Sequence, residues 1–527
     1  MVRFSRAVCL NFGPKLVLLA MLLPAGCGRT QLGPDASARM DAPQAALAEP
    51  SQTAPTDFNS EEYAAIEENP FKKTLTEPQS TFSIDVDTAS YANVRRMLQQ
   101  GRVPPPGAVR IEELINYFQY DYPAPSGEHP FSVTTELSAC PWQPEHQLLR
   151  VGLKGQAIEH EERSACNLVF LLDVSGSMLD EKKLPLVKSA LQLLTAELRK
   201  DDRVAIVVYA GASGLVLDST PARQRSEILT AIDSLTAGGS TNGGQGIELA
   251  YRVAKEHQVA GGISRVILCT DGDFNIGTTS DSALLELIQE QARSDVFLTV
   301  LGFGSGNLKD SKMELLADKG NGNYAYIDSL LEARKVLVEQ VGGTLVTIAK
   351  DVKIQLDFNP QHVQSYRLLG YENRLLQNQD FRDDSKDAGE IGAGHTVTAF
   401  YELVPVGGQT LPESRASEFV QSKLISTADS SHMLTVNLRY KLPKSPDSSE
   451  FQVRVLANSL TTKPSLDFQF ASAVVGYGLL LRHSQHAGRV NWDWVLETAQ
   501  EGCGRDSSGL REEFVQLAKT AREICGE

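Results

Sequence analysis

The stretch NLVFLLDVSGSM, Asn167–Met178, decides the fold class. A run of five apolar residues leads without alternation into Asp173 and is followed by polar turn residues. An apolar run of this length is typical of a strand buried on both faces, as in a parallel sheet with helices on each side. Ligand sites in such sheets lie beyond the carboxyl ends of the strands. The sequence therefore places the side chains of Asp173, Ser175 and Ser177 at a candidate site.

The segment 165–343 continues this pattern. Further aliphatic strands read RVAIVVYA, RVILCTDGD and DVFLTVLGFG, and between them apolar residues recur at spacings of three and four. Such spacing indicates amphipathic helices. Strands that alternate with helices predict an α/β fold with a doubly wound, mostly parallel sheet.

Patterns of β type flank this segment on both sides. Residues 58–160 mix strands with helices and predict an N-terminal α+β module, whereas 344–464 show the alternation of a β-sandwich. Because β patterns lie on both sides, we hypothesise that the middle unit is inserted between two halves of one supporting sandwich. The connections 155–164 and 341–347 would then run side by side.

The segment 465–527 is predicted to be helical. It contains LDFQFASAVVGYGLLLR, the most apolar stretch after the amino-terminal region, which is too short for a confident membrane span. We expect a buried helix there. Cys503 and Cys525 bracket the last amphipathic helix, which makes them the candidate pair for a disulfide.

The amino terminus has the features of a processing segment. Basic residues precede a short apolar run, and small residues follow it, which is typical of a secretory signal over 1–26. The sequence LPAGC resembles a bacterial lipoprotein signal, which implies that Cys27 becomes the lipidated first residue. The rest of 27–57 is rich in Ala, Pro, Gln and Ser and predicts a disordered tether. We expect an exported protein with a lipid anchor in a bacterial membrane, the outer membrane where the organism has one.

The net charge of the chain bears on which class of macromolecule it can bind. The chain of 527 residues has a formal net charge of −16 and no run rich in Lys or Arg. Nucleic acid binding depends on basic surfaces, so this composition argues against a nucleic acid partner.

Polar side chains at three separated places form the candidate site. Asp173, Ser175 and Ser177 follow the first buried strand, Thr241 lies in the glycine-rich loop GGSTNGG, and Asp271 follows the strand of CTDGD. All five offer oxygen, which favours Mg²⁺, Mn²⁺ or Ca²⁺ over zinc or copper. Because three of them are neutral hydroxyls, the bound cation would be only partly neutralised and would attract an outside carboxylate.

The order and spacing of these residues resemble the metal-ion-dependent adhesion site of von Willebrand factor type A domains. The resemblance implies that Ser175, Ser177 and Thr241 contact the metal, and that Asp173 and Asp271 hold it directly or through water. Flanking stretches such as FSIDVDTASYANVRR and GNGNYAYID resemble a bacterial subfamily of type A domain lipoproteins whose role is unassigned.

The preferred function is therefore a non-enzymatic, Mg²⁺-dependent binding protein that grips an Asp or Glu side chain of a protein partner. One alternative is a Mg²⁺-dependent phosphoryl-transfer enzyme, and another is an envelope scaffold. The enzyme pattern requires a second Asp two positions after the first as acid and base. Here that residue is Ser175, whose hydroxyl has no suitable pKa for the role.

Overall fold

The computed structural model describes residues 60–159, 161–210, 212–239, 243–272, 274, 280–339, 346–408 and 431–526. All of them belong to one unit, Asp57–Glu527. The predicted signal, Cys27 and the predicted tether lie outside the described residues, as does Thr241 of the candidate site.

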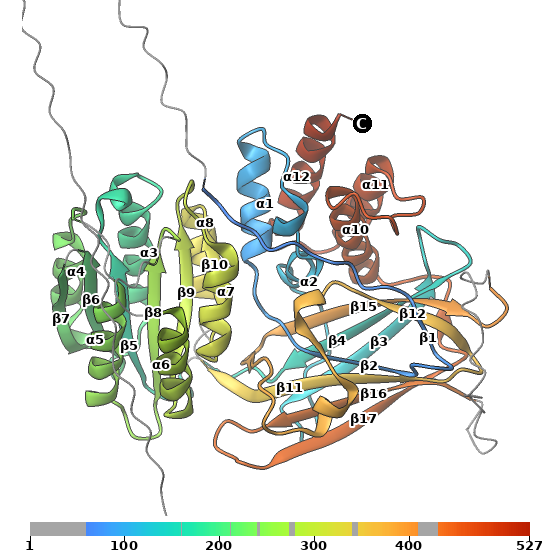
Figure 1. Ribbon diagram of the computed structural model, residues 1–527, viewed down its shortest axis with the longest axis horizontal. Coiled ribbons are helices and arrows are strands. Elements are labelled where there is room, and N and C mark those ends of the chain that lie inside the picture. The colour runs from blue at the N-terminus through green and yellow to red at the C-terminus, as the bar shows by residue number, and fades with distance from the viewer. Residues whose placement is uncertain are drawn as a thin grey trace, which may run out of the picture. The chain divides into compact units, whose positions relative to one another are not determined.

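The middle of the chain folds as a doubly wound sheet, drawn in green and yellow in Figure 1. Its strand order is β10-β9-β8-β5-β6-β7, and all neighbours are parallel except β6 and β7. The central strand β5 contains the apolar run of NLVFLLD and is buried along its whole length. The strands are β5 (Cys166–Asp173), β6 (Arg203–Ala210), β7 (Ala212–Pro221), β8 (Ile263–Thr270), β9 (Val296–Phe303) and β10 (Tyr324–Ile327).

Helices cover both faces of this sheet, and each face has its own hydrophobic core. One core includes residues of α3 (Leu184–Glu197), α4 (Arg225–Ser234) and α8 (Leu330–Arg334). The other includes residues of α5 (Gly243–Glu256), α6 (Asp281–Arg293) and α7 (Asp310–Lys319). The predicted fold class of this segment, a doubly wound and mostly parallel sheet, is confirmed.

A β-sandwich lies outside this segment in sequence, and its two sheets enclose a third core. One sheet has the order β1-β12-β15-β4-β3-β18, and the other has β13-β2-β11-β16-β17, with β14 paired to β11. The strands of the first sheet are β1 (Lys72–Lys73), β3 (Phe131–Ala139), β4 (Gln147–Gly155), β12 (Val363–Leu369), β15 (Thr396–Pro405) and β18 (Leu460–Thr461). Those of the second are β2 (Gln79–Ser83), β11 (Thr347–Phe358), β13 (Leu375–Leu376), β14 (Ile391–Gly392), β16 (His432–Lys441) and β17 (Ser448–Leu456).

The predicted N-terminal α+β module, 58–160, and the predicted β-sandwich-like module, 344–464, interleave their strands in this sandwich. Strand β4 pairs with β15, and β2 pairs with β11, so strands from both segments alternate within the same sheets. Neither segment could complete its hydrogen-bonding ladders alone, because each leaves central strand edges that the other fills. The strands form one sandwich.

The sandwich supports the hypothesis of an inserted middle unit. At the point of departure, Gly155 N–H donates to His395 O at 2.8 Å, and at the point of return, Ala393 N–H donates to Val346 O at 2.8 Å. A Cβ on Gly155 would lie 2.9 Å from Cδ1 of Ile348, so the two connections are neighbours. Residues 341–345 of the second connection lie outside the described part of the chain.

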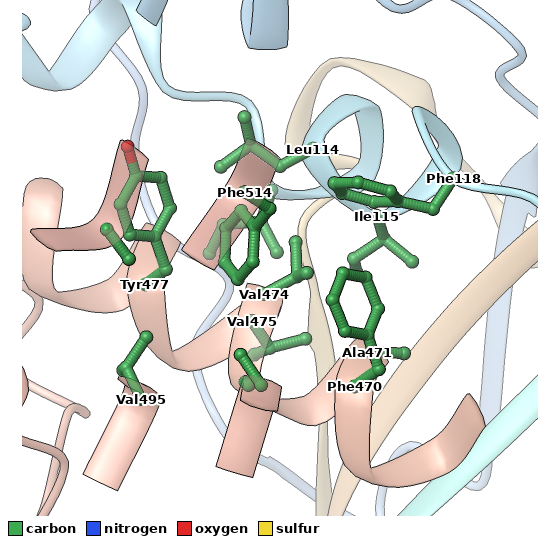
Figure 2. Close-up of a cluster of buried hydrophobic side chains, with 14 of the residues drawn as sticks. Leu114, Ile115, Phe118, Phe470, Ala471, Val474, Val475, Tyr477, Val495 and Phe514 are labelled. Carbon is green, nitrogen blue, oxygen red and sulfur yellow. The ribbon is translucent and has the colours of Figure 1, made fainter. Parts of the chain in front are cut away.

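Helices from both ends of the chain share a further core. Figure 2 shows Phe118 of the amino-terminal part close to Phe470 and Phe514 of the carboxyl-terminal helices. The predicted buried helix is α10, which is apolar all round because other elements surround it. These helices are α1 (Ala89–Gln99), α2 (Ile111–Asn116), α10 (Leu466–Leu481), α11 (Trp492–Gly502) and α12 (Leu510–Cys525). Within the described ranges, no helix combines the length and hydropathy needed to cross a bilayer.

The predicted disulfide between Cys503 and Cys525 is wrong, since neither sulfur is in a disulfide. Arg511, near the start of α12, donates to Cys503 O at 3.4 Å, whereas Cys525 is the last residue of the same helix. Cys525 is the fourteenth residue after Arg511 in α12, which places it about 21 Å further along the helix axis. A disulfide requires the two Cα atoms to lie within about 7 Å.

Candidate metal centre

Strand β5 carries the first part of the candidate site. Asp173 is its last residue and only 1% exposed, and the chain then turns through η2 (Gly176–Leu179). The Ser175 N–H donates to Asp173 Oδ1 at 2.8 Å, and the hydroxyl oxygens of Ser175 and Ser177 lie 2.9 Å apart. Ser175 is buried and Ser177 is exposed, so the cluster opens to solvent at Ser177.

Strand β8 brings Asp271 to the same edge. The strands β5 and β8 are parallel neighbours, with Leu172 opposite Cys269, and Asp271 directly follows the end of β8. Asp271 is fully buried, and its charge acts on Asp173. The structure therefore brings together Asp173, Ser175, Ser177 and Asp271 as the parallel arrangement requires.

The glycine-rich loop begins beside the same turn. Gly238 N–H donates to Val174 O at 2.7 Å, and Gly176 N–H donates to Gly239 O at 3.1 Å. The chain thus reaches 240–242 from a point hydrogen-bonded to the DVSGS turn. Thr241 itself lies outside the described residues.

Each of the two carboxylates keeps one oxygen for which the described residues offer no hydrogen-bond partner. These atoms, Oδ2 of Asp173 and Oδ1 of Asp271, are buried. Burying such an atom without a partner costs about 1–3 kcal/mol, and more when it is charged. Two unsatisfied carboxylate oxygens next to two hydroxyls form a donor set that fits a hard divalent cation.

The two carboxyls titrate in opposite directions. Burial raises the pKa of Asp173 to about 6, against hydrogen bonds from Ser175 that lower it. Burial also acts to raise the pKa of Asp271, but the hydrogen bond and the charge of Lys183 outweigh it and lower the pKa below its ordinary value.

Sequence reasoning missed Lys183, which pairs with Asp271. Lys183 lies in LDEKKL, which reads as a solvated turn, and no spacing rule singles it out.

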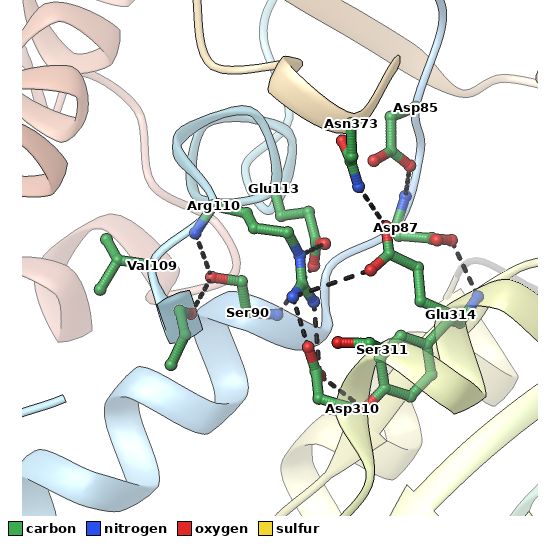
Figure 3. A network of polar contacts seen from close by, with 12 residues as sticks. Asp85, Asp87, Ser90, Val109, Arg110, Glu113, Asp310, Ser311, Glu314 and Asn373 are labelled. Carbon is green, nitrogen blue, oxygen red and sulfur yellow. Dashed lines mark hydrogen bonds and ion pairs between the residues drawn. The ribbon is translucent and has the colours of Figure 1, made fainter. Parts of the chain in front are cut away.

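A second group of acids, Asp85, Glu113 and Glu314, has carboxylate oxygens within 4.8 Å of one another (Figure 3). Asp85 accepts hydrogen bonds from Asp87 N and Arg374, and Glu113 accepts them from Ser90 N and Arg110. Glu314 accepts from Asn373 and Arg374. Because each acid already has partners, we interpret this group as an ion-pair network and not as a metal site.

Comparison with known proteins agrees with the fold of residues 166–327. The family model "von Willebrand factor type A domain" matches residues 167–340, "von Willebrand factor" matches 57–150, and "Uncharacterized protein YfbK, C-terminal" matches 343–524. The uncharacterized protein YfbK of Escherichia coli is 42% identical over 469 residues, which cover 87% of this chain and 80% of that protein. The chain belongs to the YfbK family.

Two further matches cover less of this chain than YfbK does. The uncharacterized protein sll0103 of Synechocystis is 33% identical over 190 residues, 35% of this chain and 43% of that protein. Among solved structures, a von Willebrand factor type A protein from Catenulispora acidiphila is 15% identical and covers 77% of this chain and 91% of its own, with a TM-score of 0.42. Type A domains are typically protein-interaction modules that commonly bind a divalent metal.

Proposed function

We propose that this protein is a non-enzymatic binding protein. It uses a divalent cation, by preference Mg²⁺, to bind a carboxylate of a protein partner. The observation that carries the proposal is the pair of unsatisfied buried oxygens on Asp173 and Asp271 beside the hydroxyls of Ser175 and Ser177. A partner's Asp or Glu would reach the site on the open side at Ser177.

Each residue has a distinct part in this proposal. Ser175 and Ser177, with Thr241 of the glycine-rich loop, would hold the ion through neutral hydroxyls, while Asp173 and Asp271 would hold it directly or through water. A cation bound mainly by neutral oxygens supplies a Lewis-acidic position for an outside carboxylate. Asp173 also accepts from the Ser175 backbone and thereby orients the Ser175 side chain.

The geometry favours binding over phosphoryl transfer. Catalysis of that kind needs a positioned acid and base two residues after Asp173. The residue there is Ser175, whose hydroxyl lies 2.9 Å from the hydroxyl of Ser177.

We propose further that the protein is exported and anchored to a bacterial membrane through lipid on Cys27, with 28–57 as the tether. Metabolic labelling with a fatty acid analogue tests the anchor, because label should be lost in Cys27→Ala.

Pull-down of partners from envelope extracts tests the binding function. Captured proteins should differ between buffers with Mg²⁺ and with EDTA, and Asp173→Ala and Ser175→Ala should behave as the EDTA sample does. Asp201→Ala, which removes an exposed carboxylate in the same domain, is the matched control. Identical partner sets under all conditions would refute metal-dependent recognition. Phosphatase turnover that disappears in Asp173→Asn would favour the enzyme.

A further inference from the structure

A lysine already occupies part of the candidate metal centre. Lys183 is the residue before α3, and its Nζ lies 2.8 Å from Oδ2 of Asp271. The two side chains are only 10% and 0% exposed, so this ion pair is buried. It therefore interacts at a lower effective dielectric than a surface pair and is screened less by salt.

The backbone holds Lys183 in this position. Its N–H donates to Asp180 O at 2.9 Å, which fixes the turn before α3. Gly304 has a φ of +74°, and a Cβ there would lie 2.4 Å from both Cγ and Cε of Lys183. Because Gly304 has no side chain, the aliphatic part of Lys183 packs against it. This packing directs the ammonium toward Asp271.

This contact changes the charge of the site. The carboxylates of Asp173 and Asp271 alone would supply two negative charges, and the Lys183 ammonium cancels one of them. It also occupies Oδ2 of Asp271 and leaves only Oδ1 without a partner. A fixed positive charge repels an incoming cation, yet it remains beside that cation after binding and attracts an anion.

We propose that Lys183 is a built-in second cation of the metal centre, which weakens binding of the divalent ion and strengthens binding of a carboxylate to the loaded site. This inference rests on the proposed function, since it concerns the same site. Lys183 acts through Asp271 and through its charge, and is a positioning and specificity-determining residue.

Titration of purified protein with MnCl2 and MgCl2, followed by calorimetry, tests the first half. Lys183→Met and Lys183→Gln should bind both ions about tenfold more tightly than the wild type, because a like charge next to the ion is removed. Lys182→Met removes the same charge from an exposed neighbour and should stay within about twofold. Equal or weaker affinity in both Lys183 variants would overturn the proposal.

Binding of acetate to the Mn²⁺-loaded protein, measured by the relaxation rate of water protons, tests the second half. Acetate displaces ion-bound water, and its affinity should fall several-fold in Lys183→Gln although Mn²⁺ affinity rises. A purely structural role for Lys183 would lower both affinities together, and that outcome also contradicts the proposal. Lys183→Gln keeps a donor for Asp271, so it guards against loss of the fold.

Asp173→Ala separates this inference from the proposed function. If Asp173→Ala abolishes Mn²⁺ binding while the Lys183 variants match the wild type, only the role of Lys183 fails. If Asp173→Ala and the wild type bind Mn²⁺ alike, the metal centre itself is refuted, and the inference with it.

Discussion

At the scale of single residues, two groups of acids in this protein differ in their hydrogen-bond partners. Asp85, Glu113 and Glu314 receive hydrogen bonds from arginines and from backbone or amide groups, and they form a satisfied network. Asp173 and Asp271 each keep a buried oxygen for which the described residues provide no partner. The second group also lies beside the hydroxyls of Ser175 and Ser177 and opens to solvent at Ser177, so it is suited to a ligand from outside.

Glu112 is an acid whose ionisation should cost stability. Burial and the nearby charge of Glu372 raise its pKa to about 7, and its Oε2 is buried with no hydrogen-bond partner in the described part of the chain. Because the pKa is higher in the folded protein than in the unfolded chain, ionisation of Glu112 lowers the free energy of unfolding. This loss of stability is absent at low pH and grows as pH rises through 7. Glu112→Gln should therefore gain about 1–3 kcal/mol over the wild type near pH 8 and little near pH 5.

Urea denaturation at the two pH values measures this difference. Glu497→Gln changes an exposed acid of α11 and should show no pH-dependent gain. An equal effect of Glu112→Gln at both pH values would contradict the assignment.

At the scale of elements, the local sequence pattern correctly predicted individual strands and helices, because local residues determine these elements. The apolar run before Asp173 became β5, and the apolar stretch LDFQFASAVVGYGLLLR became the buried helix α10. The pairing of Phe82 with Ile354 could not be read from periodicity, because register between distant strands depends on the whole sandwich. Likewise, Lys183 meets Asp271 only because a loop on another strand, at Gly304, leaves room for its stem.

Close packing of α11 against α10 gives a prediction at this scale. A Cβ on Gly502 would lie 2.5 Å from the backbone N of Phe470 and 3.0 Å from Leu466 O. Gly502→Ala should lower the free energy of unfolding by about 1–3 kcal/mol, since helix backbone and not a side chain would have to shift. The gain in helix propensity, about 1 kcal/mol, offsets only part of this cost.

Thermal or urea unfolding measures the effect of Gly502→Ala. Gly127→Ala is the matched control, because a Cβ at 127 meets nothing within 4 Å. If both variants unfold alike, the helices are packed less closely than the structure indicates.

At the scale of the whole folded part, arginines join the type A domain to the helices of the shared core. Arg110 pairs with Glu113 of α2 and with Asp310 of α7 (Figure 3). Arg95 of α1 lies 2.6 Å from Asp328 of the domain and 3.1 Å from Glu513 of α12. The candidate metal centre is therefore carried on a domain that is held by buried ion pairs.

Arg110→Gln should remove the ion pairs of Arg110 with Glu113 and Asp310. It would leave Asp310 and Glu113 buried beside an uncharged side chain, and breaking one partner of a buried pair costs about 3–5 kcal/mol. Arg382→Gln removes an exposed, solvent-screened pair with Glu450 and should leave the free energy of unfolding nearly unchanged. Urea denaturation measures both, and a cost for Arg110→Gln as small as that of Arg382→Gln would show that the network does not hold the domain.

The most direct test of the account is anomalous diffraction from a crystal soaked in MnCl2. We predict a peak about 2 Å from the hydroxyl oxygens of Ser175 and Ser177, on the side of Asp173 and Asp271, and no such peak in Asp173→Ala. A peak at Asp85, Glu113 and Glu314 instead, or none beside Ser175, would contradict the assignment of the metal centre.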